Sequence, residues 1–305
     1  MTNTPQQTKV GFIGASGLMG HGMAKNLLLN GFPLAYTVNR TEPAGLDDLG
    51  ATRAADNAEL GRTCDVVFLC ITAATDVEAA VTGDRGLLTD PQAGLVIIDS
   101  STSEPAVTRR LAHTAADRGV RLIDAPLTRG PAEAEAGTLN MIVGSDPETL
   151  TEVRPLLEAC AENIVHAGPV GAGHTIKLLN NFVIMAQASA LAEAFAVATK
   201  SGADPQTLVD ILSIGIANNP LLHLIEQALV ENYEAMVFEL DNARKDVRYY
   251  TRLAGDLGHP TTVGDGVHEA LSLASALGFG SEYVPSLVKS AERLAGTTIR
   301  RGGHR

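Results

Sequence analysis

Lys177 and Asn181 are the residues whose types and spacing best fit proton transfer in this chain of 305 residues. A helix is predicted over 174–200, because this stretch lacks Pro and Gly and is rich in Ala and Leu. Residues four apart on a helix share one face, so the two side chains can reach one point. Partial desolvation lowers the pKa of a lysine, which makes it better suited to donate a proton to a carbonyl oxygen. The pair predicts an acid/base site; taken alone, Lys177 also fits a surface lysine with a packed stem.

A glycine-rich turn near the start of the chain is a second candidate site. Gly14, Gly17 and Gly20 follow the apolar run 9–13 and open an amphipathic helical pattern. In this context the turn amides and the helix N-terminus can face a pyrophosphate, whereas the alternative is a tight turn with no ligand. The predicted dinucleotide contacts in this turn are Gly14, Ala15, Ser16, Gly17, Leu18 and Met19.

The residues that end the second predicted strand bear on the choice of cofactor. A site that prefers NAD usually has Asp or Glu there, which binds the ribose 2′-hydroxyl. This chain has Asn39, Arg40 and Thr41 instead. Arg40 can pair with a 2′-phosphate and stack on adenine, and the Thr41 hydroxyl can donate a hydrogen bond to the phosphate. The segment favours NADP, with NAD possible; the alternative for Arg40 is a solvated loop charge.

The elements that must position these residues differ between the two halves of the chain. Up to about residue 167, short apolar runs alternate with helical patterns, as in a parallel sheet with crossover helices. The predicted strands are 9–13, 34–39, 66–71, 95–99, 120–124 and 139–143. Helical patterns follow at 205–212, 220–230, 241–254, 264–277 and 284–295. The predicted fold class is α/β, with an N-terminal doubly wound Rossmann domain at 1–168, an all-α C-terminal domain at 169–298 and a flexible tail at 299–305.

The predicted helix over 174–200 would be about 40 Å long at ~1.5 Å per residue. We expect it to join the two domains, and to be buried because it is apolar nearly all round. Its many alanines allow close helix packing. They predict a homodimer interface, and two such dimers could pair as a homotetramer.

Composition narrows the function classes. The net charge of −12 argues against nucleic acid and anionic membranes as partners. No basic and apolar leader opens the chain and no charge-free run of about 18 apolar residues occurs, so we expect a cytoplasmic protein. Three cysteines without a Cys-x-x-Cys pair disfavour disulfides and structural zinc. Because the eight histidines are scattered, no metal is predicted.

Five motifs in order resemble the β-hydroxyacid dehydrogenase family, which includes 3-hydroxyisobutyrate dehydrogenase, tartronate semialdehyde reductase and sulfolactaldehyde reductase. They lie at 14–27, 99–102, 124–130, 171–181 and 245–246, and the similarity covers nearly the whole chain. The resemblance implies reversible hydride transfer between a nicotinamide and a small anionic 3-hydroxy acid or its semialdehyde. Imine reductases share the architecture but generally replace the catalytic lysine. A catalytically silent dinucleotide-binding protein is the alternative from another class.

The resemblance also implies roles at matching positions. Lys177 takes the place of the catalytic acid/base, with Asn181 as its partner at the substrate. The implied substrate-binding residues are Thr128, Arg129, Gly130 and Lys245. Further implied cofactor contacts are Ile71, Thr72, Thr102, Lys245 and Asp246. His174, three residues before Lys177, could line the site or serve the helix end.

Two departures from the family pattern stand out. The glycine-rich turn holds one extra residue, since Ala15 and Ser16 replace a single residue. Arg129 stands where many members have Gly, and a guanidinium there offers a planar fork to a carboxylate or sulfonate. The alternative is that Arg129 only pairs with Glu133 or Glu135. A carboxylate semialdehyde is favoured over a sulfonate.

Overall fold

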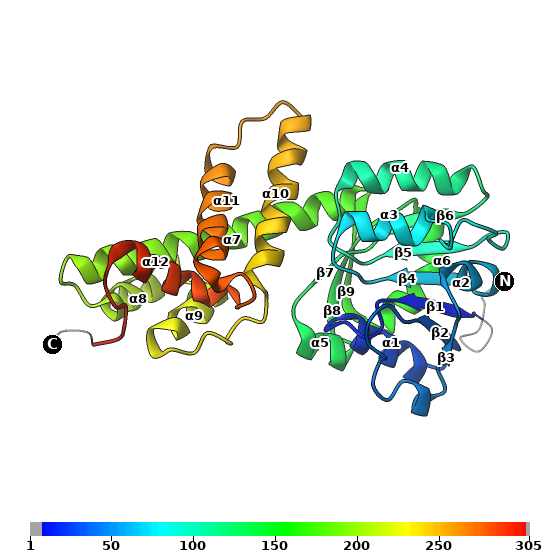
Figure 1. The fold of residues 1–305 in the computed structure, drawn as a ribbon, viewed down its shortest axis with the longest axis horizontal. Helices are drawn as coiled ribbons and strands as arrows, with labels where there is room; N and C mark the ends of the chain where they lie inside the picture. Colours follow the sequence, from blue (N-terminus) through cyan, green and yellow to red (C-terminus); the bar gives the residue numbers. More distant parts are fainter. Residues whose placement is uncertain (1–7, 303–305) are drawn as a thin grey trace. The chain divides into compact units, whose positions relative to one another are not determined.

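The computed structural model describes residues 8–302, which form two compact units (Figure 1). Unit 1 ends at Lys177 and unit 2 begins at Leu178. This division lies inside α7 (Ala172–Lys200), nine residues beyond the boundary expected from the sequence pattern. The first turn of α7 belongs to unit 1 because its backbone is hydrogen-bonded to a strand of that unit, as described below.

Nine strands form one sheet among the described residues of unit 1. They are β1 (Val10–Ile13), β2 (Leu34–Thr37), β3 (Thr52–Arg53), β4 (Val66–Leu69), β5 (Val96–Asp99), β6 (Arg121–Asp124), β7 (Leu127–Thr128), β8 (Leu139–Gly144) and β9 (Ala161–Gly168). Their order is β3-β2-β1-β4-β5-β6-β8-β7, with β9 beside β8. The pairs from β3 to β6 are parallel, whereas β8 runs antiparallel to β6 and β7. The doubly wound α/β fold is confirmed.

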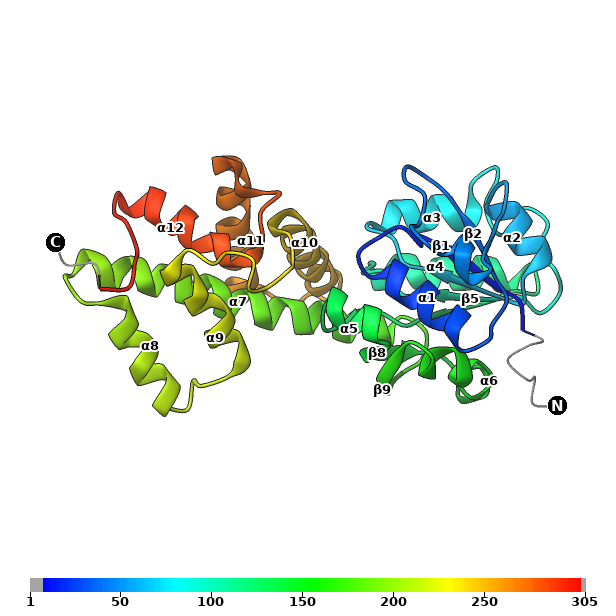
Figure 2. The same ribbon diagram turned by 90° about the horizontal axis from the view of Figure 1, so that it is seen from below.

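Helices cover both faces of this sheet (Figures 1 and 2). One face packs on α1 (Gly20–Leu29), α5 (Pro131–Ala136) and α6 (Pro147–Glu158). The other packs on α2 (Asn57–Thr63), α3 (Ala74–Thr82) and α4 (Pro105–Ala116). Every residue of β1, β4 and β5 is buried, which explains why these strands are apolar without alternation.

Unit 2 is helical. After α7 come α8 (Pro205–Ile214), α9 (Pro220–Ile225), α10 (Leu240–Asp256), α11 (Thr262–Ala274) and α12 (Leu287–Ala295). Short η3 (Glu226–Val230), η4 (Ser275–Phe279) and η5 (Val284–Ser286) join them. Asp204 and Asn219 accept a backbone hydrogen bond at the starts of α8 and α9, each just before the proline that opens the helix. A core around Phe195 and Leu271 joins these helices.

Two expectations about the C-terminal half differ from the structure. We expected α7 to be buried, but only 33% of its most apolar 18-residue stretch is, and Ile176, Val183 and Val197 are exposed. This stretch has a mean hydropathy of 1.6 and is long enough to cross a membrane, a test that core helices of water-soluble proteins also pass. We also expected a flexible tail from residue 299. However, Ile299 is buried and its amide donates to Glu292, 2.6 Å away. Residues 303–305 lie outside the described residues.

Candidate active site

The predicted cofactor residues of unit 1 gather at the carboxyl edge of the parallel strands. β1 and β4 are neighbours with Ile13 opposite Leu69, and β5 lies next with Asp99 opposite Leu69. The chain leaves β1 into the glycine-rich turn, β4 toward Ile71 and Thr72, and β5 toward Thr102. Chain connections diverge to the two sheet faces between β1 and β4, and this crevice is where open α/β sheets bind ligands.

The glycine-rich turn has the close backbone packing that a dinucleotide site requires. Gly14 has a φ of +96°, and a Cβ there would lie 2.2 Å from the Cys70 carbonyl oxygen. A Cβ on Gly20 would lie 2.1 Å from the Gly14 oxygen. The turn leads directly into α1, whose first turn has no acidic residue and no side-chain cap among the described residues. The positive end of the helix therefore faces an anion without competition, so the residues present fit a pyrophosphate.

Asn39, Arg40 and Thr41 follow the end of β2 and are all exposed. The next carboxylate, Glu42, forms an ion pair of 2.5 Å with Arg53. The Arg40 guanidinium is thus not neutralised by Glu42. This segment has no carboxylate of its own, and its Arg40 and Thr41 can both donate hydrogen bonds.

The start of α7 is anchored by Asp124, the last residue of β6. One carboxylate oxygen accepts from the Gly171 amide at 2.6 Å and the other from the His174 amide at 2.7 Å. Asp124 is fully buried. A Cβ on Gly144 would lie 2.4 Å from the same carboxylate, so a glycine is required there. Asp124 was predicted only as the end of a strand, although an acidic residue at the end of a buried strand could have indicated such a role.

His174 is part of this anchor and does not line an open site, because it is fully buried. Its Nδ1 lies 2.7 Å from the Thr108 hydroxyl and its Nε2 lies 3.0 Å from the Ser101 carbonyl oxygen. Since a carbonyl only accepts, Nε2 carries a proton. Burial raises the pKa of nearby Asp99, whose carboxylate is 3.9 Å from the imidazole. The contacts of His174 with Asp124, Thr108 and Ser101 hold in place the first turn of α7, which precedes Lys177.

One turn beyond Lys177, Asn181 is held in place within unit 2. Its side chain is buried, with 4% exposed. Its Nδ2 donates to Asp246 Oδ2 at 2.7 Å, and its Oδ1 accepts from Asn180 at 3.1 Å. Asp246 Oδ1 lies 3.1 Å from Lys245 Nζ. The structure therefore joins three predicted site residues, Asn181, Asp246 and Lys245, in one chain of contacts.

The predicted substrate loop lies between β7 and α5. The Thr128 hydroxyl accepts from Asn140 at 2.9 Å, and the Gly130 amide donates to Glu133 at 2.9 Å. Arg129 has a φ of +76°, in the left-handed region that favours glycine. This explains why glycine suits the position in other family members.

Arg129 does pair with a glutamate, but with neither of the two expected. Its Nη1 donates to Glu162 of β9 and to the Thr138 carbonyl oxygen, both at 2.5 Å. Glu133 instead accepts a hydrogen bond from the Gly130 amide. Glu135 accepts from Lys25 and from His21 of α1, at 2.5 and 2.6 Å.

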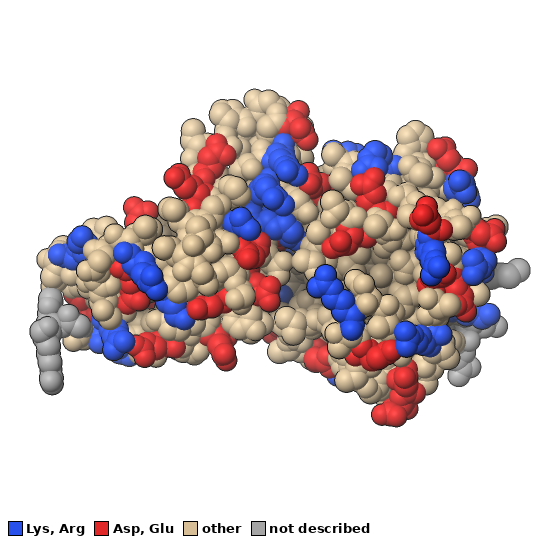
Figure 3. All heavy atoms as spheres, viewed as in Figure 1, with Lys and Arg blue, Asp and Glu red and all other residues tan. Residues whose placement is uncertain are grey.

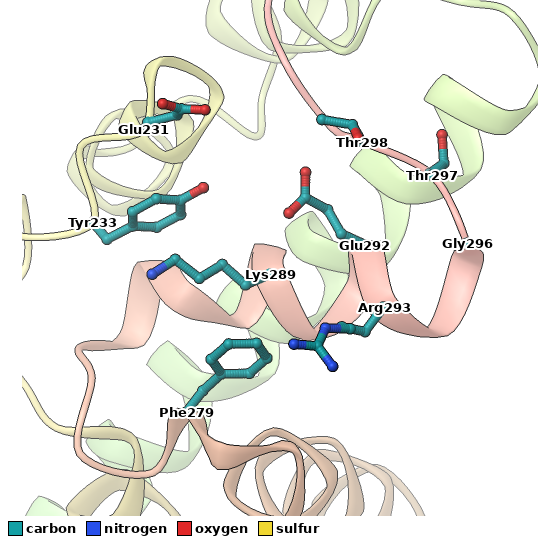
Figure 4. A pocket seen from close by; sticks show the side chains of 9 residues that line it. All are labelled: Glu231, Tyr233, Phe279, Lys289, Glu292, Arg293, Gly296, Thr297 and Thr298. Carbon is teal, nitrogen blue, oxygen red and sulfur yellow. The ribbon is translucent and has the colours of Figure 1, made fainter.

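A separate pocket of about 640 Å³ lies in unit 2, where Lys289, Glu292 and Arg293 of α12 face Tyr233 and Phe279 (Figure 4). Lys289 Nζ is 4.1 Å from the Tyr233 ring centre and 2.5 Å from Glu282. Its other lining residues are Glu231, Gly296, Thr297 and Thr298. The predicted site residues lie elsewhere.

Thiol and metal chemistry find no support in the described residues. No group of three or more His, Cys, Asp or Glu side chains in residues 8–302 could hold a metal ion. Cys64 and Cys160 are buried. Burial raises the pKa of all three thiols, to about 12 for Cys70, so all three are poor nucleophiles.

Residues 9–168 match the family model for the NAD binding domain of 6-phosphogluconate dehydrogenase. Residues 171–290 match that for the NAD-binding domain of NADP-dependent 3-hydroxyisobutyrate dehydrogenase. The chain belongs to the β-hydroxyacid dehydrogenase family. As a member of this family, it is an NAD(P)-dependent oxidoreductase, as the sequence motifs predicted.

Similar proteins of this family align over nearly the whole chain. 2-(Hydroxymethyl)glutarate dehydrogenase of Eubacterium barkeri is 29% identical over 96% of this chain and 98% of its own. The solved structure of a Mycobacterium tuberculosis 3-hydroxyisobutyrate dehydrogenase with L-serine has a TM-score of 0.84, with 26% identity over 93% of this chain and 98% of its own. An imine reductase of Myxococcus stipitatus shares the fold alone, with a TM-score of 0.62 and 15% identity over 93% of this chain and 99% of its own.

Proposed function

We propose that this β-hydroxyacid dehydrogenase is a cytoplasmic, NADP-preferring enzyme that reduces a small anionic semialdehyde to a 3-hydroxy acid, and catalyses the reverse reaction. The observation that carries the proposal is the contact chain Asn181–Asp246–Lys245, which begins one turn of α7 after Lys177. An amide and a lysine fixed by one buried carboxylate are suited to hold a polar substrate.

Each residue then has a definite task. The bound nicotinamide supplies the hydride that reduces the carbonyl carbon. Lys177 donates a proton to the carbonyl oxygen during reduction and removes it from the hydroxyl during oxidation. Asn181 orients that oxygen, because Asp246 and Asn180 fix its amide plane. Lys245, held by Asp246, contacts the substrate and the nicotinamide.

The substrate's carboxylate is proposed to bind at Thr128–Gly130. Asn140 holds the Thr128 hydroxyl, and Glu133 holds the Gly130 amide, so the loop is fixed before substrate binds. For Arg129 to clamp the anion, its guanidinium would have to leave Glu162 and the Thr138 carbonyl. A carboxylate is therefore favoured over a sulfonate as the substrate anion.

The preference for NADP rests on the exposed segment Asn39–Thr41 and on the pairing of Glu42 with Arg53. Replacing Arg40 with Glu places a like charge beside a 2′-phosphate. It should raise the KM for NADPH and leave the KM for NADH nearly unchanged. Equal effects on both cofactors would contradict the assignment of Arg40.

Self-association is proposed from the apolar side chains that α7 leaves exposed, among them Ile176, Val183 and Val197. Large apolar side chains left exposed along one helix often mark an interface. A homodimer or a homotetramer is expected. Light scattering on the purified protein tests this, and a monomer at micromolar concentration would refute it.

The reaction is tested by initial rates with succinic, tartronate and methylmalonate semialdehydes and with sulfolactaldehyde, using NADPH and then NADH. Turnover of a carboxylate semialdehyde with NADPH supports the proposal and identifies the substrate. A preference for sulfolactaldehyde would instead assign Arg129 to a sulfonate. Turnover of a cyclic imine and of none of the aldehydes would refute the proposal.

A further inference from the structure

Unit 2 contains a small pocket lined only by basic side chains. Arg244, Lys245 and Arg248 of α10 and His268 of α11 surround it. Basic side chains gather along α10 on the molecular surface (Figure 3). Like charges brought together around one cavity repel each other, so the arrangement gains stability when an anion enters.

The cations around the pocket are only partly neutralised by the protein. Arg244 Nη2 lies 3.2 Å from Asp241, but its Nε is buried without a hydrogen-bond acceptor. Arg248 forms no ion pair within residues 8–302; its guanidinium carbon lies 5.9 Å from the Tyr249 ring centre. A buried donor left unpaired is costly, so Arg244, which lines the pocket, has hydrogen-bonding capacity that the protein does not use.

The pKa of His268 is affected by the charged groups around the pocket. Burial lowers its pKa, and the charges of Arg244 and Arg248 lower it further, while Asp265 opposes them. The imidazole is therefore neutral near pH 7 and can donate one hydrogen bond without adding charge. The pocket has a volume of about 30 Å³. One water needs ~10–15 Å³, so the space suits two oxygen atoms, as in one carboxylate.

The pocket adjoins the candidate active site through Lys245. Lys245 lines the pocket, and its ammonium lies 3.1 Å from Asp246, which accepts from Asn181. All these residues belong to unit 2. A substrate held at Asn181 and Lys245 would thus have its far end near Arg248.

We propose that this pocket binds a second carboxylate of the substrate, so that the substrate class is a dicarboxylic 3-hydroxy acid with its semialdehyde. This inference rests on the proposed function, because it assigns the far end of the substrate of the same reaction. It gives Arg248 a role in specificity, with a planar fork that matches a carboxylate.

The kinetic test compares two alcohols that differ by one carboxylate-bearing arm, 2-(hydroxymethyl)glutarate and 3-hydroxyisobutyrate, each oxidised with NADP⁺. In Arg248→Gln, kcat/KM for the dicarboxylate should fall about 10- to 100-fold, while the monocarboxylate changes by less than about two-fold. Arg252→Gln is the matched control, because Arg252 lies one turn further along α10 outside the pocket lining; both substrates should be unaffected. Equal losses with both substrates, no loss with either, or a rise confined to the KM for NADP⁺ would overturn the inference.

A binding test separates this inference from the proposed function. Glutarate is titrated into the full-length protein while the His268 ring proton is followed by NMR, with His268→Gln used to assign the signal. A carboxylate in the pocket should raise the pKa of His268, and Arg248→Gln should weaken the effect. No change with glutarate in the unaltered protein would overturn the pocket assignment. If neither alcohol is oxidised but glutarate binds, the proposed function fails and the anion site stands.

Discussion

Replacing Asp124 with Asn tests how the start of α7 is held. The carboxylate accepts two backbone hydrogen bonds, from Gly171 and His174, at 2.6 and 2.7 Å in a fully buried position. Asn has the same size but only one oxygen, so its NH2 group must face one of the two amides. One bond is then lost with its donor left buried, and the other loses the contribution of the charge.

The expected cost follows from these two losses. Leaving one buried amide unpaired costs about 1–3 kcal/mol, and a bond to a charged acceptor is worth about 1.5–3 kcal/mol, of which a neutral amide keeps roughly half. Loss of favourable charge at the helix N-terminus adds about 0.5–1 kcal/mol. We therefore expect the free energy of unfolding of unit 1 to fall by about 2–5 kcal/mol.

Urea unfolding measures this change, and Asp146→Asn is the matched control. Asp146 accepts from the Thr149 amide at the start of α6 but is exposed, and Asp and Asn are nearly equivalent as helix N-caps. The control should lose less than about 0.5 kcal/mol. Turnover of Asp124→Asn should also fall about 10- to 100-fold, since a displaced α7 moves Lys177. If Asp124→Asn costs no more than Asp146→Asn, the anchor described here has no energetic role.

Three further outcomes are expected. Lys177→Ala should still bind the cofactor while turnover falls about 10²–10⁴-fold, and near-normal turnover in the same assay would remove Lys177 from catalysis. Arg129→Gly should be more stable than Arg129→Ala by about 1 kcal/mol in thermal unfolding, because both lose the ion pair and only Gly relieves the positive φ; equal stabilities would contradict the strain. The hydrogen bond with Glu135 raises the pKa of His21, so this pair stabilises the fold below about pH 6.5 and the gain is lost as pH rises through the folded-state pKa. His21→Gln should therefore lose up to about 1 kcal/mol in urea at pH 5.5 and less at pH 8.5, whereas a loss independent of pH would exclude this origin.

The buried strands were the most predictable part of the fold. The six predicted strands begin within one residue of β1, β2, β4, β5, β6 and β8, because continuous apolar runs mark strands covered on both faces. The long helix was predicted two residues short, since Gly173 was taken as a breaker. In the structure Gly173 lies inside α7, where a Cβ would come 2.3 Å from the Ile142 oxygen. The absence of a side chain at Gly173 allows α7 to pack closely against the backbone of β8.

Two of the three strands that the sequence did not reveal, β3 and β9, are held mainly by pairing rather than by burial, whereas the third, β7, has Leu127 in the core. β3 has two exposed residues, and β9 has a mostly exposed pattern that includes Glu162 and Asn163. Their hydrogen bonds to β2 and β8 depend on strands placed by the rest of the sheet. Such strand pairs cannot be predicted from the local pattern of apolar residues.

The site residues were predictable one by one, but their contacts were not. Asn181 and Asp246 are hydrogen-bonded across 65 positions, and Arg129 bonds Glu162 across 33. Several acidic residues were candidate partners for Arg129, and no local pattern distinguished them. The basic pocket likewise forms only because α11 brings His268 beside α10.

The segment after α12 also limits how the chain can be shortened. Ile299 is buried with 1% exposed, the Arg301 amide donates to the Leu229 carbonyl at 3.1 Å, and Arg300 pairs with Glu231. Truncation before Ile299 would expose η3 to solvent and forfeit about 1.5–3 kcal/mol of apolar burial. It would also leave Thr297 and Thr298, which line the pocket of Figure 4, at the free end of the chain. A tag or fusion partner attached to the C-terminal segment should therefore be joined beyond Arg301.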